Sequence, residues 1–82
     1  MTLPDQIRAA RQALGLSQQA LADALGSPSI QASIARWERG ERTPDPATLG
    51  RLAVALGTVL SHEERIDGAD VLVTARPAKV AA

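Results

Sequence analysis

The sequence contains no cysteine, one aromatic residue (Trp37) and one histidine (His62). The chain therefore has no disulfide, thiolate metal site or cysteine nucleophile, and one histidine cannot by itself form a histidine-rich metal site. The longest strongly apolar stretch, Leu52 to Leu60, is far shorter than the ~20 residues of a membrane-spanning helix. The N-terminus also lacks the basic segment and apolar stretch of a secretory signal. We expect a soluble cytoplasmic protein without a metal, a cofactor or a membrane partner.

The chain is short but apolar enough to fold. Its 82 residues fit a single domain, and hydrophobic residues make up 45% of them. The sequence is rich in alanine and nearly free of aromatic residues, which favours short, closely packed helices over a sheet, because strands prefer aromatic and β-branched residues. The composition predicts a small all-α domain.

The formal net charge is zero, which by itself argues against a nucleic-acid partner, because such proteins usually carry excess positive charge. The charges are unevenly distributed, however. No acidic residue occurs over residues 24–37, and Arg36, Arg39 and Arg42 then recur at three-residue spacing, whereas four acidic residues gather over residues 63–70. One surface can therefore be basic while the total is neutral.

Hydrophobic periodicity and capping residues predict five helices, over about residues 3–14, 17–25, 28–39, 46–56 and 61–67. The fifth rests on a capping box, Ser61-His62-Glu63-Glu64. His62 itself is expected to be solvated and without a role. A β-prone run, Val71–Thr74, follows, and the last five residues are expected to fray. The expected units are a helical domain over residues 1–67 and a C-terminal tail over residues 68–82.

The apolar residues of these helices recur at helical spacing and predict the core. The first helix is expected to turn Gln6 and Arg8 toward water. The predicted buried positions are Leu3, Ile7, Ala10, Leu14, Leu21, Ala22, Leu25, Ile30, Ile34, Trp37, Leu49, Leu52, Ala53 and Leu56.

The second and third predicted helices, joined by a tight turn after Gly26, form a helix-turn-helix pattern. In such a pair the second helix fits the ~12 Å wide major groove of DNA. The face of the third helix opposite its apolar stripe carries Gln31 and Arg36, which can bond adenine and guanine in bidentate fashion. The small side chains of Ala32 and Ala35 allow a close approach.

Five segments occur in this order along residues 6–61: Ile7-Arg8-x-x-Arg11, Leu14-Gly15-Leu16-Ser17-Gln18, Leu21-Ala22-x-x-Leu25-Gly26, Ile34-x-Arg36-Trp37-Glu38-Arg39-Gly40, and Pro44 followed by Leu49, Leu52, Ala53, Leu56 and Gly57. In this combination the chain resembles the lambda-repressor and Cro-like helix-turn-helix proteins, also called the Xre family. The resemblance covers about two thirds of the chain and implies a compact five-helix lambda-repressor-like bundle, with a possible short C-terminal β-strand.

The resemblance also implies roles for individual residues. The positions that match the family's base-reading residues are Gln31, Ala32 and Arg36. Those assigned to DNA phosphates are Gln18, Ser29, Arg39 and Arg42, and Gln18 also matches the residue that braces the first base reader. The alternative for Arg39 and Arg42 is an exposed ion pair with Glu38 or Glu41, which lie near them in the sequence. Arg11 and Glu38 match a largely buried ion pair that joins the first helix to the end of the third.

The chain departs from the family pattern in one place. The family usually counts nine positions from the glycine after the second helix to the aromatic residue of the third, whereas Gly26 and Trp37 are eleven apart. The two additional residues fall around Ser27–Ser29. Aligning the third helix on Ile34 and Trp37 gives the base readers above, whereas an alignment on Gly26 would shift them to about residues 28–32.

These features predict a sequence-specific DNA-binding transcriptional regulator that acts as a dimeric repressor at an inverted-repeat operator on double-stranded DNA, in the cytoplasm and associated with the nucleoid. Val71–Thr74 is either a loose extension or a strand that pairs across the dimer axis. One alternative is an antitoxin that regulates its own operon and contacts a toxin protein through residues 71–82. Another is a protein-interaction adaptor that does not bind DNA. We expect no enzyme, because no cluster of nucleophile, base and oxyanion donor is present.

Overall fold

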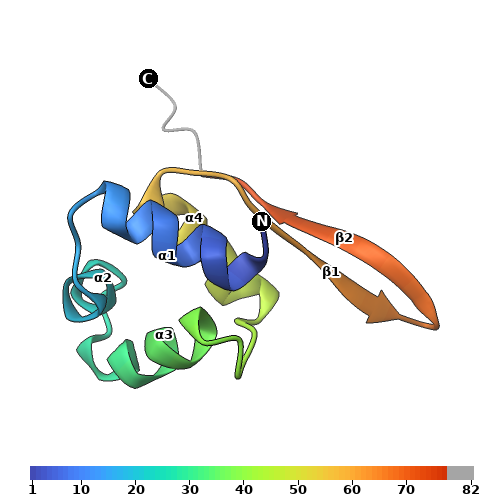
Figure 1. The fold of residues 1–82 in the computed structure, drawn as a ribbon, viewed down its shortest axis with the longest axis horizontal. Helices are drawn as coiled ribbons and strands as arrows, with labels where there is room; N and C mark the ends of the chain where they lie inside the picture. Colours follow the sequence, from blue (N-terminus) through green and yellow to red (C-terminus); the bar gives the residue numbers. More distant parts are fainter. Residues whose placement is uncertain (78–82) are drawn as a thin grey trace.

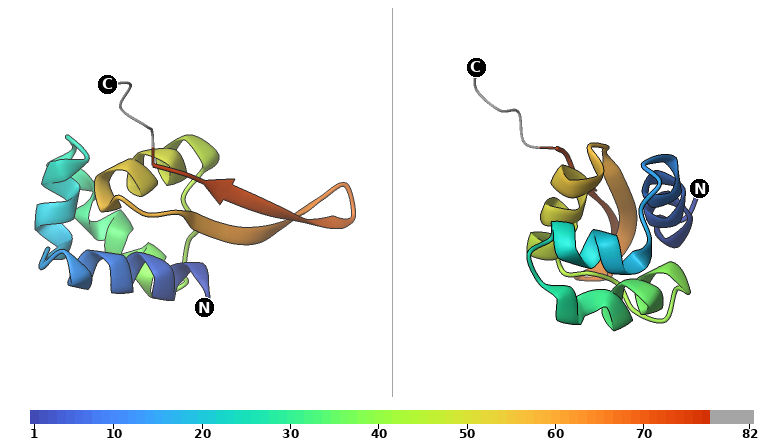
Figure 2. Two further views of the ribbon diagram at one scale, coloured as in Figure 1. Left: turned by 90° about the horizontal axis from the view of Figure 1, so that it is seen from above. Right: turned by 90° about the vertical axis from the view of Figure 1, so that its left-hand side faces the viewer.

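In the computed structural model, which describes residues 1–77, four α-helices form a compact body from which a β-hairpin projects (Figures 1 and 2). No helix within this part of the chain is long and apolar enough to cross a membrane. The elements are α1 (Leu3–Ala13), α2 (Gln18–Ala24), a 3-10 turn (Pro28–Ile30), α3 (Gln31–Glu38), α4 (Pro46–Leu56), β1 (Leu60–Ile66) and β2 (Ala69–Ala75).

Local capping explains where the helices begin and end. The backbone N–H groups of Asp5, Ala20 and Thr48 donate to the side chains of Thr2, Ser17 and Asp45, which cap α1, α2 and α4. Gly57 ends α4 in the left-handed conformation (φ 63°), where glycine carries no steric cost. The first, second and fourth predicted helices are thus confirmed to within about a turn.

The core lies between the four helices and the base of the hairpin. All the predicted core positions are buried except three: Ala10 and Ile30 are half-buried, and Leu14, which follows the last residue of α1, is 53% exposed. The prediction for Leu14 was therefore wrong. The sequence pattern also left out Leu60, which is fully buried and ties β1 to the helices. Its burial places the start of the hairpin in the same core as the helices.

The prediction of a five-helix bundle was wrong, because the segment expected to form the fifth helix is strand β1. Ser61, expected to cap that helix, lies inside the strand. The β-prone run Val71–Thr74 is indeed extended and belongs to β2, which pairs antiparallel with β1 in the same chain. Pairing with a second strand satisfies the backbone groups along one edge of residues 60–66 without a helix, so the partner strand overrides the local capping signal.

A two-residue turn, Asp67-Gly68, joins the strands. Both residues have positive φ angles (51° and 78°), as a type I′ turn requires, and Asp-Gly is one of the pairs that best tolerates them. The ladder then runs without a bulge from Ile66 opposite Ala69 to Leu60 opposite Ala75. The boundary expected between residues 67 and 68 falls inside this turn, and the expected fraying of residues 78–82 lies outside the described residues.

The side chain of Gln6 anchors the hairpin to α1. Its amide nitrogen donates to the carbonyl of Ser61 (2.9 Å), and its amide oxygen accepts from the N–H of Ser61 (3.0 Å). The same nitrogen also donates to the carbonyl of Met1. The expectation that Gln6 faces water was wrong, because its amide serves the outer edge of β1 as a neighbouring strand would.

Candidate nucleic-acid interface

Helices α2 and α3 form the helix-turn-helix, with α3 along one outer side of the body (Figure 1). Gly26 (φ 73°) ends α2, and the N–H of Ser27 turns back to the carbonyl of Ala22 (3.1 Å). The 3-10 turn follows, held by Gln19, whose amide donates to the carbonyl of Pro28 (3.3 Å). The third helix was expected from about residue 28; its α-helical part instead begins at Gln31, and the additional residues lie in the turn before it.

A buried ion pair joins α1 to the end of α3. Arg11 donates to both carboxylate oxygens of Glu38, from Nε (2.7 Å) and Nη2 (2.8 Å), and the Glu38 side chain is only 2% exposed. Arg11 also donates to the carbonyl of Leu16 (2.8 Å). Arg8, expected to face water, donates to the carbonyl of Glu38 (2.7 Å). The end of α3 is therefore held by two arginines of α1.

Burial raises the pKa of Glu38, but the hydrogen bonds from Arg11 and Gln18 and the charges of Arg11 and Arg8 together outweigh it and leave this pKa below its usual value. The pKa of Arg11 is raised, chiefly by its hydrogen bond to Glu38. Both groups stay charged near neutral pH. The interior of the domain therefore contains a charged carboxylate, whose burial is stable only while its hydrogen-bond partners are in place.

A chain of hydrogen bonds runs from this ion pair to the exposed side of α3. Gln18 donates from its amide nitrogen to Glu38 (3.3 Å), and its amide oxygen accepts from the amide nitrogen of Gln31 (3.1 Å). Because Glu38 can only accept, the amide of Gln18 has one workable orientation, and Gln31 must donate to it. Gln31 is thus fixed at the start of α3, and within residues 1–77 one N–H and the oxygen of its amide have no hydrogen-bond partner.

The remaining predicted base readers lie on the open face of α3. Ala32 and Arg36 are exposed, Gln31 and Ala35 are half-buried, and the buried side chains of α3 (Ile34, Trp37, Glu38) face the core. Within residues 1–77, Arg36 forms no ion pair shorter than 4.0 Å. A glutamine, two small residues and a free guanidinium therefore share one accessible side of a helix.

The residues predicted to contact phosphates lie around this face. Gln18 is half-buried, whereas Ser29, in the 3-10 turn, and Arg42, after α3, are exposed. Arg39 is also exposed, but its guanidinium is bonded to the carboxylate of Glu41. These four residues thus flank the face of α3 at both of its ends.

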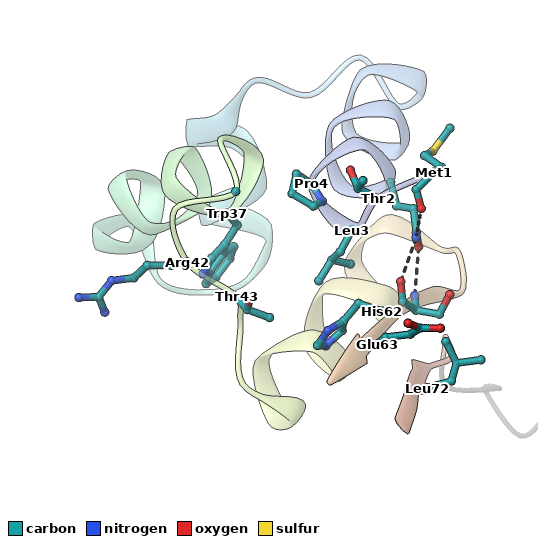
Figure 3. Close-up of a pocket in the computed structure, with 13 residues that line it drawn as sticks. Met1, Thr2, Leu3, Pro4, Trp37, Arg42, Thr43, His62, Glu63 and Leu72 are labelled. Atoms are coloured by element: carbon teal, nitrogen blue, oxygen red, sulfur yellow. Dashed lines mark hydrogen bonds between the residues drawn. The ribbon is translucent and has the colours of Figure 1, made fainter. Parts of the chain in front are cut away.

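A hollow of about 540 Å³ lies between the start of α1, the connector after α3 and the hairpin (Figure 3). Leu3, Trp37, Arg42 and His62 are among the residues that line it, and the guanidinium of Arg42 points away from it. His62 is half-buried and not solvated as expected; its Nε2 lies 3.5 Å from a carboxylate oxygen of Glu64. Residues 1–77 contain no group of three side chains placed to hold a metal ion.

Three further side chains shape the interface, and sequence reasoning missed the roles of the first two. Gln19 holds the turn before α3, Arg8 bonds the end of α3, and Glu41 engages Arg39. The first two lie on helices at positions that a periodicity analysis assigns to solvent, and their partners are backbone carbonyls that no pattern marks. The Arg39–Glu41 pair could be expected from the sequence, because the two residues carry opposite charges and are two positions apart.

The arrangement of α2 and α3 defines a helix-turn-helix protein. The model of the helix-turn-helix family HTH_3 matches residues 7–60. The chain belongs to this family, which confirms the resemblance to lambda-repressor-like (Xre) proteins.

A solved structure with a similar fold is an HTH_3 family transcriptional regulator from Vibrio cholerae, with a TM-score of 0.61 and 34% sequence identity. The match covers 68% of this chain and 30% of that protein, so this chain corresponds to less than a third of its length. The comparison with curated proteins gave no match.

Proposed function

We propose that this chain is a sequence-specific DNA-binding regulator, acting in the cytoplasm on double-stranded DNA, that places α3 in the major groove. The observation that carries the proposal is the fixed position of Gln31. A chain of hydrogen bonds from the buried ion pair holds this side chain at the start of α3, beside the exposed Ala32 and Arg36. Side chains that are immobilised before binding lose less entropy when they contact a base, which favours specific recognition.

The chemistry of this face suggests which bases it reads. After donating to Gln18, Gln31 keeps one N–H and its amide oxygen, the donor and acceptor that adenine N7 and N6 require. Arg36 suits guanine O6 and N7, and Ala32 can contact a thymine methyl group. Gln18, Ser29, Arg39 and Arg42 would bind phosphates, so affinity should fall steeply as salt increases.

Selection of bound duplexes from a random pool tests this proposal. We expect a defined site, and we expect Arg36→Ala to weaken binding to it about fivefold or more while changing binding to random DNA little, since a bidentate base contact is worth ~1–3 kcal/mol. Arg39→Ala, at the end of the same helix, should weaken binding to both DNAs similarly. Equal losses on both DNAs for the two variants would refute the assignment of these roles.

We further propose that the chain acts as a dimer joined through β2. The N–H and C=O of Ser61 both bond Gln6 and therefore point away from β2. Because these groups alternate in direction along an antiparallel strand, the ladder register leaves those of Asp70, Leu72 and Thr74 on the outer edge of β2. An edge with unpaired backbone groups and few charges favours pairing with another strand.

A second copy of the chain fits this edge better than it fits the edge of β1, which Gln6 partly occupies and which carries Glu63 and Arg65. With Leu72 opposite the partner's Leu72, Asp70 faces the partner's Thr74 and no like charges meet. This pairing would also cover Leu72, which is 64% exposed. A twofold dimer of this kind matches an inverted-repeat operator with half-sites ~34 Å apart, and blocking such a site would repress transcription.

A pair of proline variants tests the edge. Leu72→Pro removes only an outward N–H, and proline is tolerated on edge strands, so the hairpin should persist while the dimer dissociates. Val73→Pro removes an N–H that pairs with β1 and should unfold the hairpin itself. Sedimentation shows whether each variant is a dimer, and the hydrogen-exchange protection of β1 amides shows whether the hairpin is still formed. A wild-type chain that is monomeric at all concentrations, or a Leu72→Pro variant that stays dimeric, would refute pairing through β2 but not DNA binding.

A further inference from the structure

The carboxylate of Glu41 lies among the arginines at the end of α3. Gly40 (φ 75°) turns the chain, and the N–H of Glu41 donates back to the carbonyl of Arg36 (2.9 Å). This backbone bond holds Glu41 beside the last turn of the helix. There its carboxylate accepts from Nε of Arg39 and, at 3.4 Å, from Nη2 of the same guanidinium. The hydrogen bond from Arg39, with the charges of Arg39 and Arg36, lowers the pKa of Glu41.

Without the nearby Arg36 and Arg39, the end of α3 would be an unfavourable place for the carboxylate of Glu41. A helix C-terminus carries partial negative charge, which repels a carboxylate and attracts a cation. The same end of α3 would face the phosphates of a bound duplex. Among Arg36, Arg39 and Arg42, only Arg39 has a carboxylate within 4.0 Å in the described part of the chain.

We propose that Glu41 occupies Arg39 in place of a DNA phosphate and so restrains binding to DNA of any sequence. This proposal rests on the proposed DNA-binding function. Carboxylates and phosphates bind a guanidinium through the same pair of N–H donors, so the two compete for one side chain. An exposed pair of this kind is weak enough for a correctly placed phosphate to displace.

The consequence is a lower affinity for DNA of any sequence. Phosphate contacts supply nearly all the affinity at random sequences and also contribute at the specific site. Because Arg39 is expected to contact a phosphate in both complexes, competition from Glu41 lowers both affinities by a similar factor. Glu41 therefore sets the overall strength of DNA binding and leaves the ratio of specific to random binding unchanged.

Glu41→Gln tests this role, with Glu63→Gln as a matched control that makes the same change of charge on the hairpin. Binding is measured with the full chain, on the selected duplex and on a random-sequence duplex, over a range of salt. Glu41→Gln should bind the random duplex about threefold or more tightly than Glu63→Gln does. Its salt dependence should be steeper by about 0.9, the value for one additional phosphate contact.

A second background shows whether the effect passes through Arg39. In Arg39→Ala chains, Glu41→Gln should change binding no more than Glu63→Gln does; a full effect there would overturn the proposal. Equal binding by the Glu41→Gln and Glu63→Gln variants would also overturn it. If the wild-type chain binds no duplex, the proposed function fails, and elution from a heparin column then tests Glu41 alone. Elution of Glu41→Gln at no higher salt than Glu63→Gln would refute competition for Arg39.

Discussion

Replacing Arg11 with alanine should be among the most damaging single changes in this protein. Glu38 is buried, and Arg11 supplies both of its shortest hydrogen bonds (2.7 and 2.8 Å). Without Arg11 the carboxylate keeps only the amide of Gln18 and the charge of Arg8, whose Nε is 3.7 Å away and whose side chain is 45% exposed. A buried charge would then remain with partners too weak to replace its lost hydration.

Breaking a buried pair from one side costs ~3–5 kcal/mol. A chain of 82 residues has a total stability of only about 4–12 kcal/mol, at ~0.05–0.15 kcal/mol per residue. The Tm of a domain this size falls ~4–8 °C per kcal/mol, so Arg11→Ala should lower it by at least about 12 °C. Arg65→Ala, which removes one partner of the exposed Arg65–Asp70 pair, should cost less than ~1 kcal/mol.

The effect should depend on pH with a defined sign. In the wild-type chain the pKa of Glu38 is lowered, so its pairing stabilises the fold above the unfolded-state pKa of about 4.3 and this stabilisation is lost as the pH falls through the folded value. In Arg11→Ala, burial should instead favour the protonated form of Glu38. Lowering the pH therefore reduces the destabilisation that this substitution causes. Urea unfolding at pH 7 and pH 4 should show the difference between the two chains shrinking at pH 4. A cost below 1 kcal/mol at pH 7, or one that does not change with pH, would refute this reasoning.

Three further changes test other parts of the structure. Gln18→Ala removes the brace of Gln31 and should weaken binding to the selected DNA more than to random DNA, measured by anisotropy; an unchanged ratio would contradict the brace. Gln6→Ala should reduce hydrogen-exchange protection in β1 and β2 while α2 and α3 keep theirs, since only the anchor of the hairpin is lost. Gly68→Ala should destabilise the hairpin by ~1–2 kcal/mol, because alanine at φ 78° is strained; unchanged hairpin protection would argue against the type I′ turn.

The helices could be predicted from the sequence because their signals are local. Thr2, Ser17 and Asp45 each lie within three residues of the N–H they accept from, so a capping pattern contains both partners. The helical stripes likewise locate most of the core. Leu14 shows the limit of the pattern, because it follows the periodicity of α1 but lies just beyond its last residue and turns outward.

The hairpin could not be predicted in the same way, because its stability comes from residues far apart in the sequence. Ser61 and Glu64 match a capping box, but Ser61 is bonded to Gln6, 55 residues away. The burial of Leu60 depends on the same packing. The pair Asp67-Gly68 is the local signal for a hairpin turn. Because a β-prone run follows it within a few residues, it predicts a hairpin more strongly than the capping box predicts a helix.

The two additional residues before α3 illustrate how packing sets the orientation of a helix. A turn of altered length can rotate the helix that follows, but Ile34 and Trp37 are both buried, and they fix which side of α3 meets the core. The hydrogen bond from Gln31 to Gln18 fixes the start of α3 independently, from the opposite end. The 3-10 turn absorbs the extra length because its wider rise per residue connects α2 to a helix whose position is already determined. The face that carries Ala32 and Arg36 is therefore outward because the apolar face is inward, whatever the length of the turn.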